Sequence, residues 1–364
     1  MSLSGNLSLI KDNFTLKTGY FSFSSQGVTA IFGVSGSGKT TFLRALAGFE
    51  PEIKGELIFG EEIWLGVKKT MPVHKRKLGY VFQEPSLFTH LNVEQNLRYG
   101  LKRAKRIVGK RTLNGSYIEF NQVVSWLGLG SLLNRDVANL SGGEKQRVAI
   151  GRALLSQPKI LMMDEPLASL DIFAKRQIMP YLEKLRDELA IPILYISHSA
   201  EEVERLADNV VFMEQGKISA IEPIEKALNK KHTPLYQHSE PKSVLPAMIK
   251  NHLEEEGLTE LLVGNSQIFV PLLDKKLGEK ARVVIAASQV SLIHEKPQQT
   301  SMLNHLPVEI EAIDDFNNYS QLVTLRIQNN PLPLLAQITK RSVQQLHLQP
   351  KQYWVAAIKT VSIL

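Results

Sequence analysis

The sequence predicts an α/β domain, with a mixed sheet core and an added α-helical subdomain, followed by an all-β domain of the small-barrel type. Three observations support this. Residues 28–32 form an apolar, strand-like run that leads through a glycine-rich loop into the helix-like segment 41–47. A second apolar run, 160–164, ends in a carboxylate, as expected of a buried parallel strand that reaches the edge of an α/β sheet. Beyond about residue 260 the chain changes to short β-like segments separated by turns.

The glycine-rich loop is the most specific of the short motifs. It consists of Gly33, Val34, Ser35, Gly36, Ser37, Gly38, Lys39 and Thr40, and it fits the pattern G-x-x-x-x-G-K-[ST]. The glycines let backbone N–H groups approach phosphates, Lys39 can reach the β- and γ-phosphates, and the Thr40 hydroxyl can bind Mg²⁺. We therefore expect the loop, with Thr41 in the following helical turn, to hold the phosphate tail of ATP.

Two carboxylates follow the apolar run 160–163. Asp164 stands at the expected tip of a parallel strand, and ligands of open α/β sheets bind at such tips. We expect Asp164 to hold Mg²⁺, directly or through water, and Glu165 to polarise the attacking water. The alternative is a pair of ordinary surface carboxylates at a strand end.

Two further polar residues follow strand-like runs. Gln83 comes after the run 78–82, and its amide can reach Mg²⁺ or the attacking water. His198 comes after the buried run 192–197 and can donate a hydrogen bond to the γ-phosphate. The alternative for each is an ordinary polar side chain without a role in catalysis.

A Ser-Gly-Gly turn precedes another helix-like segment. Ser141, Gly142 and Gly143 are expected to form a second anion site, because a helix N-terminus presents unpaired N–H groups and a partial positive charge. One chain with two half-sites for one phosphate tail suggests that two copies close on ATP head to tail. The alternative is that Ser141 and Glu144 only form a capping box.

With these motifs in this order, residues 1–235 resemble the nucleotide-binding subunits of ATP-binding-cassette (ABC) transporters. In the resemblance the loop is Walker A, Asp164 ends Walker B, Gln83 is the Q-loop, Leu140–Arg147 the signature, Ser169–Asp171 the D-loop and His198 the switch histidine. It implies ATP hydrolysis with Mg²⁺, a nucleotide-binding role for Asp171, a homodimer, and membrane permease partners at the cytoplasmic face of the bacterial inner membrane. The family's adenine-stacking aromatic residue is left unassigned between Phe14 and Tyr20.

The chain is expected to divide into 1–235, a segment 236–299 that holds a linker and the first part of a β regulatory domain, and 300–364. Residues 86–140 would form the helical subdomain, in which the segment 86–91 lines either the core or a groove for a permease helix. The prolines at 241 and 246 are typical of a linker. A hairpin is expected over 210–218 and a short helix over 342–346. The β-like segments of the tail are 261–263, 267–270, 281–285, 308–313, 321–327 and 353–358.

This tail resembles the oligonucleotide-fold regulatory domain of importer ATPases, and from residue 300 onward the molybdate-binding Mop module. Leu303 stands where that module commonly has arginine. The resemblance, which also covers the ATPase part, implies uptake of molybdate or tungstate delivered by a periplasmic oxyanion-binding protein. Alternatives are import of sulfate, ferric iron or a sugar, and a tail that only dimerises. The candidate oxyanion ligands are Ser301, Asn304, Thr339, Lys340 and Lys359.

Composition narrows the function classes. The chain has 364 residues, no cysteine and a formal charge of +7, so neither a disulfide nor a thiolate metal site is expected. No apolar run reaches the roughly 18 residues of a membrane span, and no signal peptide is evident. The densest basic run, 102–106 with 110–111, has no interleaved aromatic residues and is expected to be a solvated face. A soluble ATPase acting on nucleic acid is the alternative of another class, but no coiled-coil insert or zinc module supports it, and no nucleic-acid partner is expected.

Overall fold

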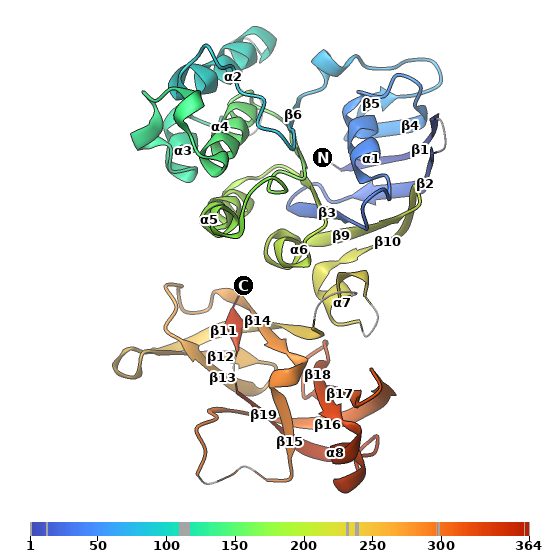
Figure 1. Ribbon diagram of the computed structural model, residues 1–364, viewed down its shortest axis with the longest axis vertical. Coiled ribbons are helices and arrows are strands. Elements are labelled where there is room, and N and C mark those ends of the chain that lie inside the picture. Colours follow the sequence, from blue (N-terminus) through green and yellow to red (C-terminus); the bar gives the residue numbers. More distant parts are fainter. Residues whose placement is uncertain are drawn as a thin grey trace. The chain divides into compact units, whose positions relative to one another are not determined.

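The computed structural model describes residues 2–11, 14–108, 117–230, 233–236, 240–295, 297, 299–359 and 361–363. These residues form two compact units, Met1–Glu222 and Pro223–Leu364 (Figure 1). The second part of the basic run, 110–111, lies outside the described residues. Within the part of the chain that is described, no helix is long and apolar enough to cross a membrane.

A six-stranded sheet with the order β10-β9-β3-β8-β7-β6 is the centre of the first unit. β3 pairs in parallel with β8 and β9, and β7 pairs in parallel with β6 and β8. Every residue of β3, β7 and β8 is buried, which explains why these strands are continuous apolar runs in the sequence. The expected hairpin over 210–218 is present as β9 and β10. The bounds are β3 (Val28–Phe32), β6 (Leu78–Val81), β7 (Ile160–Asp164), β8 (Ile193–Ser197), β9 (Asn209–Glu214) and β10 (Lys217–Pro223).

A smaller antiparallel sheet with the order β2-β1-β4-β5 shares a core with the six-stranded sheet. The helix α1 (Lys39–Ala47) packs in that core: Phe42 lies in one hydrophobic cluster with Leu7 of β1 and Ile196 of β8. Gly48, at φ 90°, ends α1 in the left-handed conformation that is typical of a glycine after a helix. The strands are β1 (Leu3–Lys11), β2 (Phe14–Phe23), β4 (Lys54–Phe59) and β5 (Glu62–Leu65).

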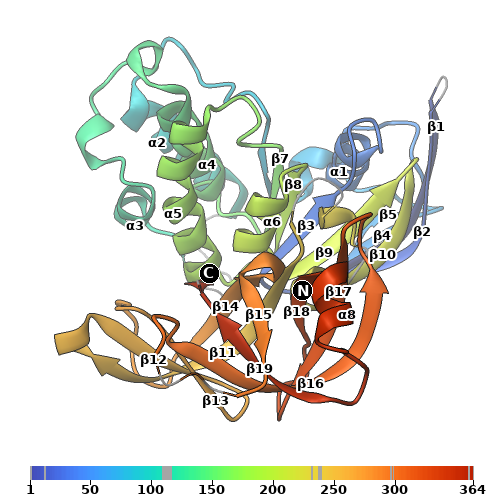
Figure 2. The ribbon, with the colours of Figure 1, turned by 60° about the horizontal axis from the view of Figure 1, so that its bottom comes forward.

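The remaining helices of the first unit pack in a second core, in which Leu97, Val123, Ile150 and Leu182 come from four different helices. Figures 1 and 2 both show α2, α3 and α4 as one group that stands apart from α1. Of these, α2 and α3 lie within the range 86–140 expected for the helical subdomain, and α4 follows that range. The helices are α2 (Val93–Val108), α3 (Phe120–Trp126), α4 (Gly142–Leu154), α5 (Ile172–Glu188) and α6 (Ala200–Leu206).

Within its described residues, the second unit is all-β apart from two short α-helices, α7 (Ile224–Leu228) and α8 (Lys340–Gln345), and three single-turn 3-10 helices. Its sheets, β13-β12-β11-β14-β20 and β15-β19-β16-β17-β18, enclose one core that includes Val283 and Ile310 (Figure 2). This confirms the predicted small-barrel class. The strands are β11 (Lys242–Leu253), β12 (Leu258–Val263), β13 (Ser266–Pro271), β14 (Lys280–Ala286), β15 (Val290–Ile293), β16 (Asn304–Asp315), β17 (Ser320–Ile327), β18 (Leu334–Thr339), β19 (Tyr353–Ile358) and β20 (Ser362–Ile363).

The structure differs from the expected organisation at the junction of the units. The boundary falls after Glu222, before residue 235, because Asn229 donates a hydrogen bond of 3.0 Å to the Val244 carbonyl and so joins α7 to β11. Pro246 was interpreted as part of a linker, and this is corrected: it lies inside β11. At Pro246, β11 pairs with β14 on one side, but its pairing with β12 on the other side begins only at Met248. A proline is tolerated there because its missing N–H can lie on the unpaired side of the strand.

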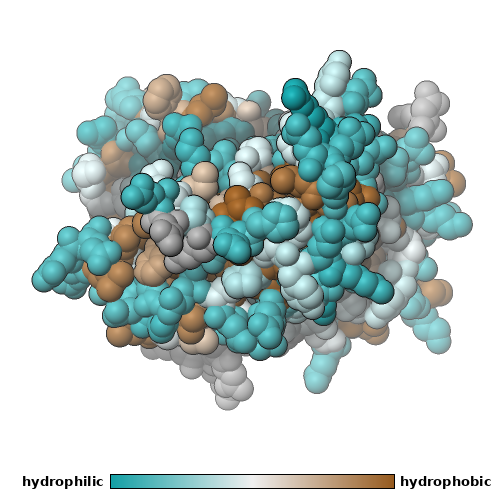
Figure 3. Space-filling view, turned by 90° about the horizontal axis from the view of Figure 1, so that it is seen from below, coloured by the Kyte–Doolittle hydropathy of each residue, from teal (hydrophilic) through white to brown (hydrophobic). Residues whose placement is uncertain are grey.

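The face of the molecule seen in Figure 3 carries hydrophobic residues in separated groups among hydrophilic ones. Scattered apolar side chains of this kind are normal on a folded surface and do not by themselves define a docking face.

Candidate nucleotide-binding site

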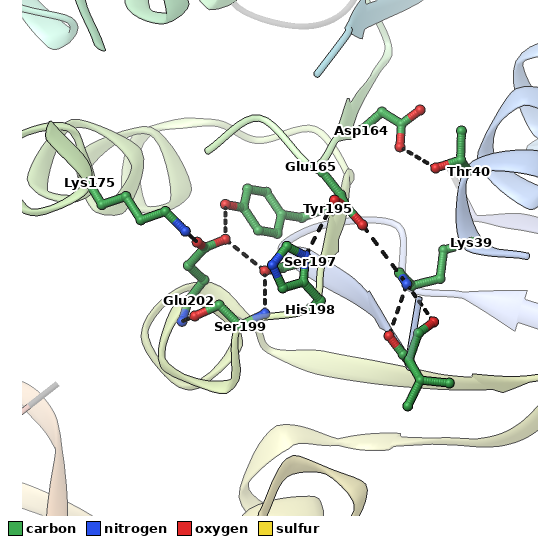
Figure 4. Close-up of polar contacts among 12 residues, drawn as sticks. Lys39, Thr40, Asp164, Glu165, Lys175, Tyr195, Ser197, His198, Ser199 and Glu202 are labelled. Atoms are coloured by element: carbon green, nitrogen blue, oxygen red, sulfur yellow. Dashed lines mark hydrogen bonds and ion pairs between the residues drawn. The ribbon is translucent and has the colours of Figure 1, made fainter. Parts of the chain in front are cut away.

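The parallel strands bring the predicted site residues to one edge of the six-stranded sheet. Phe32 at the end of β3 pairs with Ser197 of β8, and Ile196 of β8 pairs with Asp164 at the end of β7. The residues that follow these strand ends are Gly33, Glu165 and His198. Three segments that are far apart in the sequence therefore meet at one place, as Figure 4 shows for Lys39, Glu165 and His198.

The glycine-rich loop has the backbone that its sequence predicts. Gly36 and Gly38 have φ angles of 80° and 98°, which L-residues with a Cβ rarely adopt. A Cβ on Gly33 would lie 2.3 Å from the Met213 carbonyl oxygen, so only glycine fits there. A Cβ on Gly38 would lie 2.4 Å from Cζ of Phe14, which is partly buried and packs beside the loop, whereas Tyr20 is exposed.

Lys39 is 4% exposed and lies under the loop. Its ammonium group donates hydrogen bonds to the carbonyls of Gly33 at 2.9 Å and Val34 at 3.0 Å, and it lies 3.9 Å from Glu165 Oε1. Burial lowers the pKa of Lys39, and the charges of Glu165 and Asp164 oppose that shift. A desolvated cation whose hydrogen bonds go to neutral carbonyls is well placed to exchange them for phosphate oxygens.

Ser37 supplies a second polar group in the loop. Its side chain is 2% exposed, and its hydroxyl oxygen has no hydrogen-bond partner among the described residues. A buried hydroxyl without a partner is costly in a folded protein. This orphaned donor fits a loop that completes its hydrogen bonds with an anionic ligand.

Asp164 is held by hydroxyl donors on both carboxylate oxygens. Thr40 donates to Oδ1 at 3.0 Å, and Tyr80 of β6 donates to Oδ2 at 2.9 Å. Burial raises the pKa of Asp164, while the hydrogen bonds from Tyr80 and Thr40 lower it. The Thr40 hydroxyl and the Asp164 carboxylate are oxygen donors within contact of each other, which is the kind of ligand set that Mg²⁺ takes.

Glu165 and His198 form the second polar pair. Glu165 has a φ of 44°, in the left-handed region that is uncommon for a residue with a Cβ. Its Oε2 lies 3.3 Å from Nδ1 of His198, while its Oε1 faces Lys39 (Figure 4). Glu165 is 19% exposed and His198 is 54% exposed, so the pair is open to a solvent molecule or ligand.

The other predicted residues lie in the same unit but do not all meet the phosphate loop. Gln83 is exposed two residues beyond β6, which is the neighbour of β7. Ser141 caps α4 and forms the full capping box with Glu144, as the alternative interpretation predicted. Asp171 caps α5 by accepting a hydrogen bond from the Ala174 amide at 2.8 Å.

Ser141 and Gly142 are nevertheless exposed at the start of α4, whereas Gly143 is buried. A Cβ on Gly142 would lie 2.9 Å from the Leu170 side chain, which brings the segment before Asp171 against the turn of the same chain. Figures 1 and 2 show that α4 stands apart from α1, the helix that follows the glycine-rich loop of the same chain.

Two residues of this region were missed in the sequence. Tyr80 bonds the predicted metal ligand Asp164, and Glu202 bonds the segment that carries His198. Tyr80 gave no local signal, because its role depends on β6 lying beside β7. Glu202 gave a weak one, since it comes four residues after His198 at the start of a helix.

The candidate oxyanion ligands of the second unit do not form one site in a single chain. Asn304 is buried, and its amide exchanges two hydrogen bonds with the backbone of Phe269. It begins β16, near the exposed Ser301, and pairs with Ile358, next to the exposed Lys359.

The other two candidates belong to the opposite end of β16. Lys340 lies 3.2 Å from Asp315, the last residue of that strand, and Thr339 caps α8. One group of donors therefore gathers at the start of β16 and the other at its end.

Comparison with known proteins agrees with this description. Residues 16–168 match the family model described as "ABC transporter", and residues 300–364 match the one described as "TOBE domain". A solved structure, cbiO1 of Clostridium perfringens, described as part of an ABC transporter complex, is 28% identical, with a TM-score of 0.53 over 63% of this chain and 91% of its own. The fold and the site thus define an ATPase of the ABC class.

The full-length relatives are more specific. The chain is 44% identical over 340 residues to the molybdenum import ATP-binding protein ModC of Methylococcus capsulatus, covering 93% of each chain. It is 42% identical over 343 residues to the protein of the same name in Pseudomonas aeruginosa, again covering 93% of each. The chain therefore belongs to the family of molybdenum import ATP-binding proteins.

Proposed function

We propose that this chain is the ATP-hydrolysing subunit of a bacterial importer for molybdate, with tungstate as an alternative solute. The observation that carries the proposal is the 44% identity over 93% of both chains, which includes the second unit as well as the ATPase unit. Sulfate, ferric iron and sugar importers share the nucleotide site, so the full-length similarity favours molybdate over those solutes. It equally disfavours a soluble ATPase that acts on nucleic acid.

ATP would bind with its phosphates in the glycine-rich loop, where Lys39 exchanges the Gly33 and Val34 carbonyls for β- and γ-phosphate oxygens. Thr40, Asp164 and Gln83 would hold Mg²⁺, which neutralises the charge that develops on the phosphates. Glu165 accepts a hydrogen bond from the attacking water and orients it in line with the γ-phosphate. His198 contacts Glu165 and donates to the γ-phosphate, so that catalysis is positioning and charge stabilisation.

Two copies would close head to tail on two ATP molecules. The helix start at Ser141 and Gly142 is exposed, and α4 stands apart from α1 of its own chain in Figure 1, which supports this arrangement. Gly143 and Asp171 of the same copy would complete the partner's half of each site. Closing and reopening of the dimer would then drive the permease between its two states.

A cavity of about 390 Å³ in the first unit is a fitting site for a permease helix. Its wall includes Phe49, Tyr80, Phe88 and Tyr99, together with the cations Arg103 and Arg152. The guanidinium carbon of Arg152 lies 4.9 Å from the ring centroid of Phe88, and the same group donates a hydrogen bond of 2.9 Å to the Ser86 carbonyl. Arg152 therefore connects the cavity wall to the loop that follows Gln83. Because the wall combines aromatic rings with cations, it suits an occupant with apolar and acidic side chains.

The same proposal places the chain at the cytoplasmic face of the inner membrane as a peripheral subunit, held there by the permease. A periplasmic oxyanion-binding protein would be an indirect partner, since it delivers solute to the permease from the other side. The second unit would bind molybdate or dimerise. Because its candidate ligands gather at both ends of β16, a molybdate site that uses all of them would combine donors from two copies of the chain.

Transport by purified components tests the proposal. Proteoliposomes that carry this chain and a molybdate permease that binds it should take up labelled molybdate and tungstate when ATP is supplied. Vesicles with the Lys39→Ala chain should take up neither. Uptake of sulfate, iron or a sugar with no uptake of molybdate would overturn the choice of solute. Stimulation of the ATPase by nucleic acid instead of permease would overturn the transport function.

A further inference from the structure

Glu202 of α6 is a buried carboxylate, 5% exposed, behind the segment that carries His198. It accepts hydrogen bonds from the Tyr195 hydroxyl at 2.9 Å and the Ser197 hydroxyl at 2.7 Å, and its other oxygen lies 3.0 Å from the Lys175 ammonium (Figure 4). A charge so far from water requires compensation of this kind.

These bonds tie both sides of His198 to Glu202. On one side Ser197 donates its hydroxyl proton to the carboxylate and accepts a hydrogen bond of 3.0 Å from the Ser199 amide. On the other side the Ser199 hydroxyl accepts a hydrogen bond of 3.4 Å from the Glu202 backbone amide and so caps α6. His198 therefore projects from a short turn whose two flanking residues are both bonded to Glu202: Ser197 to its carboxylate, and Ser199 to its backbone amide.

Lys175 connects this turn to a third element. It belongs to α5, one helical turn after Asp171, which caps that helix. Its ammonium group is the cation that neutralises Glu202. The carboxylate thus joins β8, α6 and α5 directly behind the pair of Glu165 and His198.

We propose that Glu202 is a positioning residue for ATP hydrolysis, which acts by fixing the orientation of His198 toward Glu165 and the γ-phosphate. The inference rests on the proposed role of His198. This role differs from that of an ordinary buried ion pair. Loss of an ion pair that only stabilises the fold would have the same effect on hydrolysis whichever side chain stands at position 198.

A double-mutant cycle measures this dependence. Glu202→Gln keeps the shape of the side chain but loses the charge and one acceptor. We expect it to slow single-turnover hydrolysis about 10- to 100-fold, as small displacements of catalytic groups do, with ATP affinity within about twofold of the parent, since uniform binding is untouched. In the His198→Ala background the same change should alter the rate by less than about twofold. Glu201→Gln, at an exposed position on the same helix, is the matched control and should be silent in both backgrounds.

Milder variants keep the test decisive if Glu202→Gln does not fold. Ser197→Ala and Lys175→Met each remove one partner of Glu202, and each should slow hydrolysis in the parent but not in the His198→Ala background. Equal slowing in both backgrounds, for whichever of these variants fold, would overturn the proposal while leaving the role of His198 intact. Parent-like hydrolysis by His198→Ala itself would overturn both.

Discussion

The hydroxyl of Tyr80 donates a hydrogen bond of 2.9 Å to Oδ2 of Asp164, the oxygen that Thr40 does not contact. Tyr80 also packs against Phe49 and Phe82, with ring centroids at 5.1 and 4.6 Å, and it lines the cavity proposed for the permease helix. One side chain therefore touches both the proposed metal ligand and the proposed docking groove. Because Oδ2 is occupied by Tyr80, Oδ1 is fixed toward Thr40.

Tyr80→Phe removes this hydrogen bond and keeps the ring. Hydrogen bonds to charged groups contribute about 1.5–3 kcal/mol, so we expect the Mg²⁺ concentration for half-maximal hydrolysis to rise about tenfold. The maximal rate at saturating Mg²⁺ should change little. Titrating ATPase activity with Mg²⁺ would measure this midpoint, and electron paramagnetic resonance of bound Mn²⁺ would measure metal affinity directly. Tyr99→Phe in the same cavity is the control, and equal midpoints for the two variants would contradict the role of Tyr80.

Glu165→Gln should separate ATP binding from hydrolysis. Loss of the carboxylate that orients the attacking water is expected to slow hydrolysis about 100- to 1000-fold, while Lys39 and the loop still bind nucleotide. The variant should accumulate as an ATP-bound dimer in size-exclusion chromatography. Glu188→Gln, on the exposed face of α5, serves as control. Hydrolysis by Glu165→Gln at the parent rate would show that another group orients the water.

Ser141 should act on the nucleotide of the partner chain. A purified heterodimer of one Ser141→Arg chain and one Lys39→Ala chain then carries both lesions in one composite site and retains ATP at the other. Bound nucleotide counted per dimer should be one.

The control for this heterodimer places both substitutions, Ser141→Arg and Lys39→Ala, in one chain and pairs it with a parent chain. Each composite site then carries one lesion, and neither should bind ATP tightly. Two equally occupied sites in the first heterodimer would contradict the arrangement in trans.

Phe88→Asp should uncouple transport from hydrolysis. Phe88 packs against Tyr99 at 4.6 Å, and Asn96 bonds both its amide and its carbonyl, so the side chain is presented at the cavity by a fixed backbone. A carboxylate there would be drawn to Arg152 and would obstruct an apolar helix. We expect ATPase activity of the isolated chain within about threefold, unchanged thermal unfolding, and loss of ATP-driven uptake.

Val67→Asp is the control for this experiment, because Val67 is 93% exposed elsewhere in the unit and should tolerate charge. A melting temperature several degrees lower for Phe88→Asp alone would instead assign Phe88 to the core, which is the alternative that the sequence left open.

Oxyanion binding by the second unit is expected to depend on dimerisation. Calorimetric titration of the full chain should detect molybdate and tungstate but not sulfate, with weaker binding on dilution to monomer. Ser301→Ala and Lys340→Ala should each abolish the heat, since they remove donors from the two ends of β16. Lys250→Ala, whose ammonium pairs with Glu260, is the control. No heat with any oxyanion would leave this unit as a dimerisation module.

Much of the site could be predicted from the sequence because its functional groups lie in short, contiguous motifs. The φ angles of Gly36 and Gly38 follow from the loop motif, and the burial of β3, β7 and β8 follows from their apolar runs. The class of the second unit was equally predictable from its alternating short strands. Each of these features depends on dihedral preferences and periodicity within a few residues.

The sequence by itself thus determined which residues stand at strand tips and helix starts, including Lys39, Asp164 and Ser141. Only the tertiary structure decided which of them meet. Tyr80 reaches Asp164 because β6 lies beside β7, and Lys175 reaches Glu202 because α5 packs beside α6. Strand order and helix docking are set by pairing between segments distant in the chain, where the free energy comes from shared burial and not from any local pattern.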